Sequence, residues 1–148
     1  MRSYLSFQIG NEIFAANVKN VINILEMTKV TQVPKSPAYM KGVINLRGSV
    51  LPVLDARLKF GLEETAYTTD TCILVLDIEI KNESILLGVI VDSVREVIQL
   101  ADSDIQASPS IGTSYNADIL WGMAKVQDEF VMLIDVNKVF SDEEVINI

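Results

Sequence analysis

Apolar and polar residues alternate along two short runs in the first half of the chain, residues 43–47 and 50–54, and this alternation predicts two β-strands. Gly48-Ser49 separates the runs. Glycine before a small polar residue is typical of a two-residue hairpin loop, because glycine adopts the positive φ that such a loop needs. Successive side chains point to opposite faces of a strand, so Arg47 is expected at the last outward strand position, beside the turn. The pattern therefore predicts a hairpin with an exposed arginine near its tip.

A short helical turn is expected directly after this hairpin. Asp55 is of the residue type that caps helix N-termini, because a short side-chain oxygen can accept from the first free backbone N–H groups. Gly61 is of the type that ends a helix in a left-handed conformation. The predicted unit is thus a hairpin, a capped helical turn and a stop.

This unit occurs twice in the chain. Residues 42–60 align without a gap with residues 122–140, and the alignment matches Gly42 with Gly122, Asp55 with Asp135, and Phe60 with Phe140. A shorter upstream repeat aligns Val18, Val21 and Ile24 with Val91, Val94 and Val97. Matches at special positions in the same order predict an internal duplication, with repeat units at approximately residues 4–60 and 72–140.

The remaining apolar patterns predict further strands and few helices. Strands are expected at residues 4–9, 12–16, 24–33, 72–80, 85–91 and 94–100, with a helical turn at residues 18–22. Residues 101–118 are polar and predict a long connection, and residues 141–144 fit a capping box that opens a short C-terminal helix. About ten short strands with few helices predict an all-β protein of two small barrels or sandwiches.

Charge and composition exclude several classes of protein. The formal net charge of −8 argues against nucleic acid and anionic lipid as main partners. The longest apolar run, residues 85–91, is too short to span a bilayer, and the N-terminus lacks the apolar core of a signal peptide, so a cytosolic protein is expected. Residues 1–74 carry two more basic than acidic side chains, whereas residues 75–148 carry ten more acidic ones. Different partners for the two halves, or solubility alone, would explain this asymmetry.

The candidate chemistry is sparse. The chain has no histidine and a single cysteine, Cys72, so the commonest general base and metal ligand are absent, and no phosphate loop or dinucleotide motif occurs. Asp55 and Asp135 are the only candidates for a paired-aspartate hydrolase. Neither is followed by the small-residue turn that such enzymes use, and each begins a short helical turn, so we interpret both as N-caps. No catalytic residue, metal site or cofactor is predicted.

Binding surfaces are the remaining candidates for function. The repeat-related residues Val21, Ile24, Val94 and Val97 either line the seam between the repeats or belong to the core. Arg47 lies among apolar neighbours, and arginine in such a setting is favoured at interface hot spots. A small-molecule-binding barrel stays open as an alternative.

The stretch KGVINLRGSVLPVLDARLKFG, residues 41–61, resembles the signature of CheW-type bacterial chemotaxis coupling proteins, and the likeness continues over nearly the whole chain. The resemblance implies two intertwined five-stranded SH3-like β-barrels on a shared core, with strands exchanged between the repeats. It also implies a non-catalytic adaptor that joins the cytoplasmic tips of chemoreceptors to the histidine kinase CheA. Such a protein is cytoplasmic, is recruited to membrane-associated receptor arrays without inserting into the membrane, and needs no cofactor.

The resemblance also assigns contact residues. Val21, Ile24, Gly88 and Val97 would line a receptor groove between the barrels, Lys41 and Val50 would face the regulatory domain of the kinase, and Arg47 would lie where both contacts meet. Asn23 departs from the family, which often has glutamate at this position, and this puts in doubt any salt bridge expected there.

Overall fold

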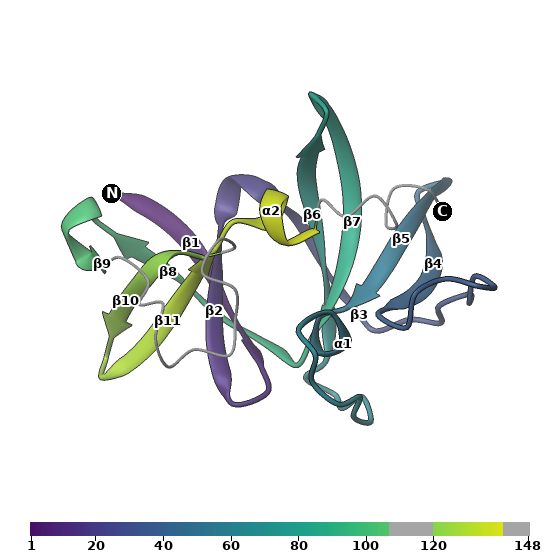
Figure 1. Ribbon diagram of the computed structural model, residues 1–148, viewed down its shortest axis with the longest axis horizontal. Coiled ribbons are helices and arrows are strands. Elements are labelled where there is room, and N and C mark those ends of the chain that lie inside the picture. The colour runs from purple at the N-terminus through teal and green to yellow at the C-terminus, as the bar shows by residue number, and fades with distance from the viewer. Residues whose placement is uncertain (107–119, 141–148) are drawn as a thin grey trace.

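The protein is built from two mostly antiparallel β-sheets and a few short helices (Figure 1). The computed structural model describes residues 1–106 and 120–140. One sheet has the strand order β8-β1-β2-β11-β10-β9. Its strands are β1 (Arg2–Ile9), β2 (Glu12–Asn17), β8 (Ser93–Leu100), β9 (Ile105–Gln106), β10 (Leu120–Val126) and β11 (Glu129–Ile134). We call it the six-stranded sheet.

The five-stranded sheet has the order β3-β6-β7-β5-β4. Its strands are β3 (Val21–Glu26), β4 (Met40–Leu46), β5 (Ser49–Asp55), β6 (Cys72–Ile80) and β7 (Glu83–Val91). The helices are α1 (Ala56–Lys59) and α2 (Val136–Phe140), with 3₁₀ turns η1 (Val18–Asn20) and η2 (Asp102–Asp104). None of the helices described is long and apolar enough to cross a membrane.

The prediction of a mostly β protein with two sheets and short helical turns is confirmed, with differences in detail. The six-stranded sheet gains the two-residue strand β9, which lies with η2 in the stretch predicted as a plain connection. The strand predicted over residues 24–33 runs instead from Val21 to Glu26 and is followed by a single bridge between Thr31 and Val43. The capping box predicted at residues 141–144 and the short helix expected to begin there lie outside the described residues.

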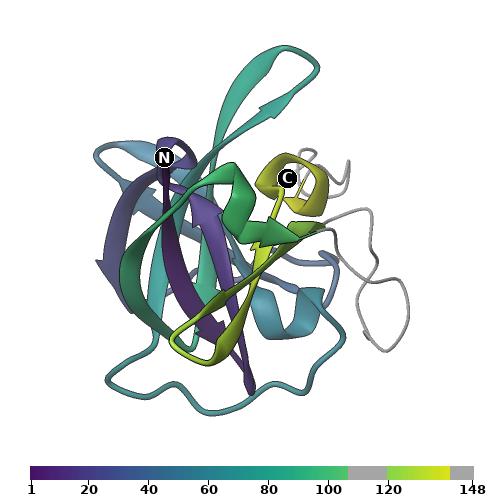
Figure 2. The same cartoon turned by 90° about the vertical axis from the view of Figure 1, so that its left-hand side faces the viewer.

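Each sheet combines strands from both halves of the chain. The six-stranded sheet joins β1 and β2 to β8, β10 and β11, and the five-stranded sheet joins β6 and β7 to β3, β4 and β5. The halves meet through two parallel pairs, β2 with β11 and β5 with β7, and through two antiparallel pairs, β1 with β8 and β3 with β6. Figure 2 shows the purple N-terminal strands beside the yellow-green strands from the end of the chain. The repeat units themselves stay a prediction.

The core consists of one hydrophobic cluster shared by the two sheets and one further cluster within each sheet. The shared cluster packs Phe7 and Phe14 of the six-stranded sheet against Leu74 and Leu87 of the five-stranded sheet. The rings of Phe14 and Phe60 stack there with centroids 5.3 Å apart. A second cluster lies within the six-stranded sheet around Tyr4 and Leu133, and a third within the five-stranded sheet around Val53 and Ile73. Burial of aromatic and aliphatic side chains between the sheets holds the two sheets together.

The turn of the β4–β5 hairpin differs from its prediction by one residue. β4 ends at Leu46, which pairs with Ser49, so the two-residue loop is Arg47-Gly48 and Arg47 is not a strand residue. Both loop residues have positive φ, 53° and 84°, as a type I′ turn requires. The side chain of Asn45 supports the turn, because its Oδ1 accepts from the backbone N–H of Gly48 at 2.9 Å.

Candidate interaction surfaces

The β4–β5 hairpin carries all three residues assigned to kinase contact. Val50 is 72% exposed beside the turn, Arg47 is exposed within the turn, and Lys41 lies near the other end of β4. We call Lys41, Arg47 and Val50 the hairpin surface. An exposed aliphatic side chain next to a guanidinium can bury apolar area and pair bidentately with a partner carboxylate at the same time. No ion pair to Arg47 occurs within the part of the chain that the structure describes.

The ammonium group of Lys41 is already engaged by the protein itself. It forms an ion pair with the carboxylate of Glu64, and this hydrogen bond raises the pKa of Lys41. The ring of Tyr67 lies 6.0 Å from Lys41 Nζ. Glu64 and Tyr67 belong to the polar segment that connects β5 to β6 through α1, so this segment covers part of the hairpin. A partner that uses the charge of Lys41 has to compete with Glu64.

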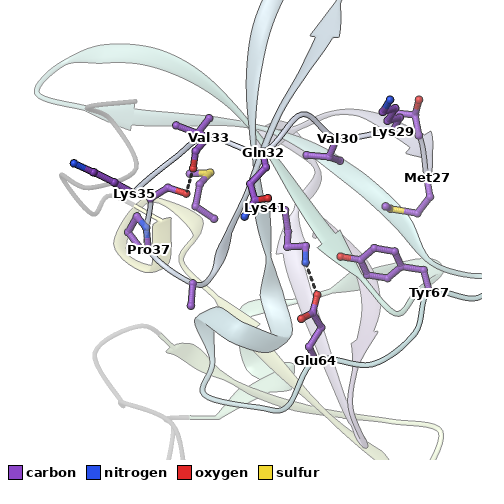
Figure 3. A pocket seen from close by; sticks show the side chains of 14 residues that line it. Met27, Lys29, Val30, Gln32, Val33, Lys35, Pro37, Lys41, Glu64 and Tyr67 are labelled. Atoms are coloured by element: carbon purple, nitrogen blue, oxygen red, sulfur yellow. Dashed lines mark hydrogen bonds and ion pairs between the residues drawn. The ribbon is translucent and has the colours of Figure 1, made fainter.

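An open groove of about 750 Å³ lies beside Lys41 (Figure 3). Its walls come from the segment between β3 and β4 and from Glu64 and Tyr67, and they mix apolar side chains such as Met27 and Val30 with lysines. Within residues 1–106 and 120–140, no three histidine, cysteine, aspartate or glutamate side chains are grouped as a metal site requires. The groove therefore adjoins the hairpin surface at Lys41, which is one of its lining residues.

The residues assigned to receptor contact are divided between the two sheets. Val21 and Ile24 lie on β3, at one edge of the five-stranded sheet, and Val97 lies on β8, at one edge of the six-stranded sheet. Ile24 is 46% exposed and Val97 58%, whereas Val21 packs partly against the shared core. We call Val21, Ile24 and Val97 the edge-strand surface. Apolar side chains that stay exposed on edge strands are available to a partner.

Gly88 lies in the core. It is buried on β7 between Val53 of β5 and Val75 of β6. An added Cβ would lie 3.0 Å from Ile73 Cγ2 and 3.2 Å from Val53 Cγ2, so a larger residue would force these side chains to shift. Its direct assignment to a receptor groove stays a prediction, and its observed environment is that of a core residue.

Phe130 is an exposed side chain that the sequence patterns did not single out. It lies on β11 beside the turn of the second hairpin and is highly exposed. In the aligned repeats Phe130 corresponds to Val50. The alignment therefore contained the signal that could have identified it, because repeat-related positions share their place in a hairpin.

Asp55 and Asp135 act as N-caps, which confirms their interpretation. Asp55 Oδ1 accepts from the backbone N–H of Arg57 at 2.9 Å at the start of α1. Asp135 Oδ1 accepts from the backbone N–H of Asn137 at 3.0 Å at the start of α2. The hydroxyl of Tyr67 donates to the other oxygen of Asp55 at 3.3 Å. Each carboxylate thus satisfies free N–H groups of its own helix.

Replacing either cap by asparagine is expected to change the free energy of unfolding by no more than about 1 kcal/mol, because asparagine caps nearly as well as aspartate. Burial raises the pKa of Asp55. The protonated form is therefore favoured in the folded state, and this stabilisation is complete below about pH 4 and is lost as the pH rises through the folded pKa. Asp55→Asn should therefore gain stability relative to the parent as the pH rises toward 7.

Urea unfolding of the parent, Asp55→Asn and Asp135→Asn at pH 4 and pH 7 measures these differences. If Asp55→Asn lowers the free energy of unfolding at pH 7 by more than about 2 kcal/mol, the fold needs the carboxylate charge and the prediction is wrong.

Known proteins resemble this chain over nearly its full length. The family model for the CheW-like domain matches residues 3–144. The chemotaxis protein CheW of Rhizobium meliloti (strain 1021) is 32% identical over 143 residues, which cover 97% of this chain and 90% of that protein. The chemotaxis protein CheW of Bacillus subtilis (strain 168) is 33% identical over 141 residues, which cover 93% and 85%.

A solved structure has the same fold. The crystal structure of the scaffolding protein TtCheW from Thermoanaerobacter tengcongensis superposes with a TM-score of 0.83 at 26% identity, and the match covers 97% of this chain and 90% of that one. The family model, the relatives and this structure agree with the resemblance found in the sequence. The chain therefore belongs to the CheW-like family of non-catalytic chemotaxis scaffolding proteins.

Proposed function

We propose that this chain couples the cytoplasmic tips of chemoreceptors to the histidine kinase CheA, and that it does so in the cytoplasm at membrane-associated receptor arrays. The observation that carries the proposal is that a member of a scaffolding family has two surfaces with exposed side chains on different strands. The hairpin surface lies on one β-hairpin, and the edge-strand surface lies on β3 and β8. A scaffold needs two such surfaces to hold two partners at once.

The hairpin surface is the proposed site of the kinase regulatory domain. Val50 offers exposed apolar area, and Arg47 adds a cation that a partner carboxylate can pair with. Truncation of such central residues commonly costs about 2 kcal/mol of binding free energy or more. Arg47 is also proposed to lie near the receptor contact.

The edge-strand surface is the proposed site of the receptor tip. Ile24 and Val97 supply exposed aliphatic side chains, and Val21 continues this area toward the shared core. Gly88 would contribute indirectly, because its lack of a side chain lets β7 pack closely against Ile73 and Val53 in the same sheet.

A duplicated ancestor is part of the proposal. Residues 1–148 would form one CheW-like domain of two barrel subdomains, with repeat units near residues 4–60 and 72–140 that exchange strands. The support is the order of equivalent strands when the two-residue strand β9 is left aside. β1 and β2 join β8, β10 and β11 of the other half, and β6 and β7 likewise join β3, β4 and β5 in the five-stranded sheet. Repeat-related positions then offer two similar hairpins for different partners.

Co-sedimentation with a receptor cytoplasmic fragment and the kinase regulatory domain tests the function. The parent is expected to bind each partner alone and to bring both into one complex. Val50→Asp should weaken binding of the kinase domain about tenfold or more and leave receptor binding unchanged, because a charge would be desolvated in an apolar contact. For the same reason Val97→Asp should weaken receptor binding about tenfold or more and leave binding of the kinase domain unchanged.

Leu86→Asp is the matched control, since Leu86 is exposed on β7 and belongs to neither surface. It should leave both affinities unchanged. Failure of the parent to bind either partner would refute the proposed function, and equal losses in all three variants would refute the assignment of surfaces.

A further inference from the structure

Asp92 lies where the chain crosses from one sheet to the other. It follows β7 of the five-stranded sheet and precedes β8 of the six-stranded sheet. Its carboxylate pairs bidentately with Arg57, with Nε to Oδ1 and Nη2 to Oδ2 both at 2.8 Å. The backbone N–H of Gly10 also donates to Oδ2 at 2.8 Å. The carboxylate thus holds three donors from two segments far apart in the sequence.

These partners belong to different sheets. Arg57 lies on α1, which follows β5 of the five-stranded sheet near the junction of the two sheets (Figure 1). Gly10 lies in the turn between β1 and β2 of the six-stranded sheet, and the backbone N–H of Asp92 donates to the carbonyl of Gln8 in β1 at 3.0 Å. The Asp92 side chain therefore connects α1, which follows β5 of the five-stranded sheet, to the β1–β2 hairpin of the six-stranded sheet.

The geometry makes this connection stiff. Both side chains are partly buried, and a planar guanidinium that meets both carboxylate oxygens fixes orientation as well as distance. Arg57 Nη1 lies 3.4 Å from the carbonyl of Glu63, which adds a further contact. Among the described residues, the other ion pairs lie within one sheet or join it to a connecting segment, such as Arg95 with Glu129 between β8 and β11.

Among residues 1–106 and 120–140, the other crossover has no ion pair that corresponds to Arg57 and Asp92. The chain passes there from β2 to β3 through η1, and the aligned repeats place Asn137 where the first repeat has Arg57. Asn137 Oδ1 accepts from the backbone N–H of Glu79 at 2.8 Å, and Asn20 Nδ2 donates to the carbonyl of Asp77 at 3.1 Å. Neutral amide contacts to β6 replace the bidentate pair, so the charged connection is a feature of the β7–β8 crossover.

We propose that Asp92 and Arg57 set the angle between the two sheets and thereby position the edge-strand surface for the receptor tip. The inference rests on the proposed function. Ile24 and Val97 lie on different sheets, so a partner that contacts both requires a defined inter-sheet angle. The hairpin surface lies on β4 and β5 alone and requires no such alignment. Asp92 and Arg57 are thus positioning residues for one partner and not for the other.

The test compares the two affinities in the same variants. Asp92→Asn and Arg57→Met should each lower the affinity for a receptor cytoplasmic fragment about fivefold or more, within the range seen for coupling residues, and leave the affinity for the kinase regulatory domain within about twofold. The double variant should be no weaker than the worse single variant, because both remove the same contact. Residual dipolar couplings should show a changed angle between the sheets and unchanged couplings within each sheet.

Asp128→Asn is the matched control. It removes one carboxylate charge from a fully exposed residue of the β10–β11 turn, where asparagine tolerates the positive φ of 66°. Both affinities and the inter-sheet angle should stay as in the parent. Arg57→Met provides the same test should Asp92→Asn not fold.

Three results would overturn the inference. They are an unchanged inter-sheet angle in both variants, a changed angle with full receptor affinity, and equal losses of affinity for receptor and kinase, which would mark a general structural role. Failure of the parent to bind the receptor fragment would refute the proposed function instead, and the couplings would still decide whether the pair sets the angle.

Discussion

Gly42→Ala is expected to lower the free energy of unfolding by about 3 kcal/mol or more. Gly42 has a φ of 144°, and an added Cβ would lie 2.0 Å from the carbonyl oxygen of Thr31 and 2.6 Å from its carbonyl carbon. Thr31 cannot retreat freely, because its N–H and carbonyl both bond to Val43 at 2.9 Å. The methyl group therefore has to break this bridge or distort β4.

Urea unfolding measures the effect, and Gly61→Ala separates its two causes. Gly61 has a φ of 78°, yet an added Cβ would meet no atom within 4 Å. Its replacement should cost only the strain of a left-handed alanine, about 1 kcal/mol. Equal losses in the two variants would show that strain alone acts at Gly42 and that the close approach of Thr31 is unimportant.

Arg47→Asn is expected to fold at least as well as the parent and yet to assemble poorly with receptor and kinase. Arg47 has a φ of 53° in the first loop position, where asparagine is favoured, and Asn-Gly is the preferred pair for a type I′ turn. Loss of a hot-spot arginine commonly costs about 2 kcal/mol, or about thirtyfold in affinity. Arg47→Lys should lose less, because it keeps the charge but not the bidentate geometry.

Thermal melting beside three-component co-sedimentation separates stability from assembly. Gln127→Asn is the matched control, because Gln127 occupies the first loop position of the second hairpin with a φ of 50°. It should stabilise the fold similarly and leave assembly unchanged. Normal assembly by both Arg47→Asn and Arg47→Ala would remove Arg47 from the site, and a large fall in melting temperature would make Arg47 a structural residue.

Local patterns were sufficient for most of the strands and for the two caps at Asp55 and Asp135. Alternation predicted the hairpin that contains β4 and β5, and the caps at Asp55 and Asp135 are confirmed by their hydrogen bonds. Such features depend on neighbours a few residues away, so the sequence carries them directly. The family signature at residues 41–61 is local as well, and the match of the CheW-like family model to residues 3–144 confirms the resemblance.

Local sequence preferences did not determine which two residues form the loop of that hairpin. Glycine first in the loop and glycine second in the loop are both acceptable two-residue turns. Pairing of Leu46 with Ser49 selected the second arrangement, and it placed Arg47 in a left-handed conformation that its residue type does not favour. Cross-strand pairing outweighed the preference of a single residue.

The sequence by itself determined the β class, the β4–β5 and β10–β11 hairpins, the caps and the family. Only the tertiary structure decided that Gly88 is enclosed by core side chains, that Ile24 and Val97 belong to different sheets, and that Arg57 meets Asp92. The physical reason is that these relations depend on which sheet each strand joins after a crossover. Alternation specifies the face of a strand but not its neighbour, and that choice is made by burial of the shared core between the two sheets.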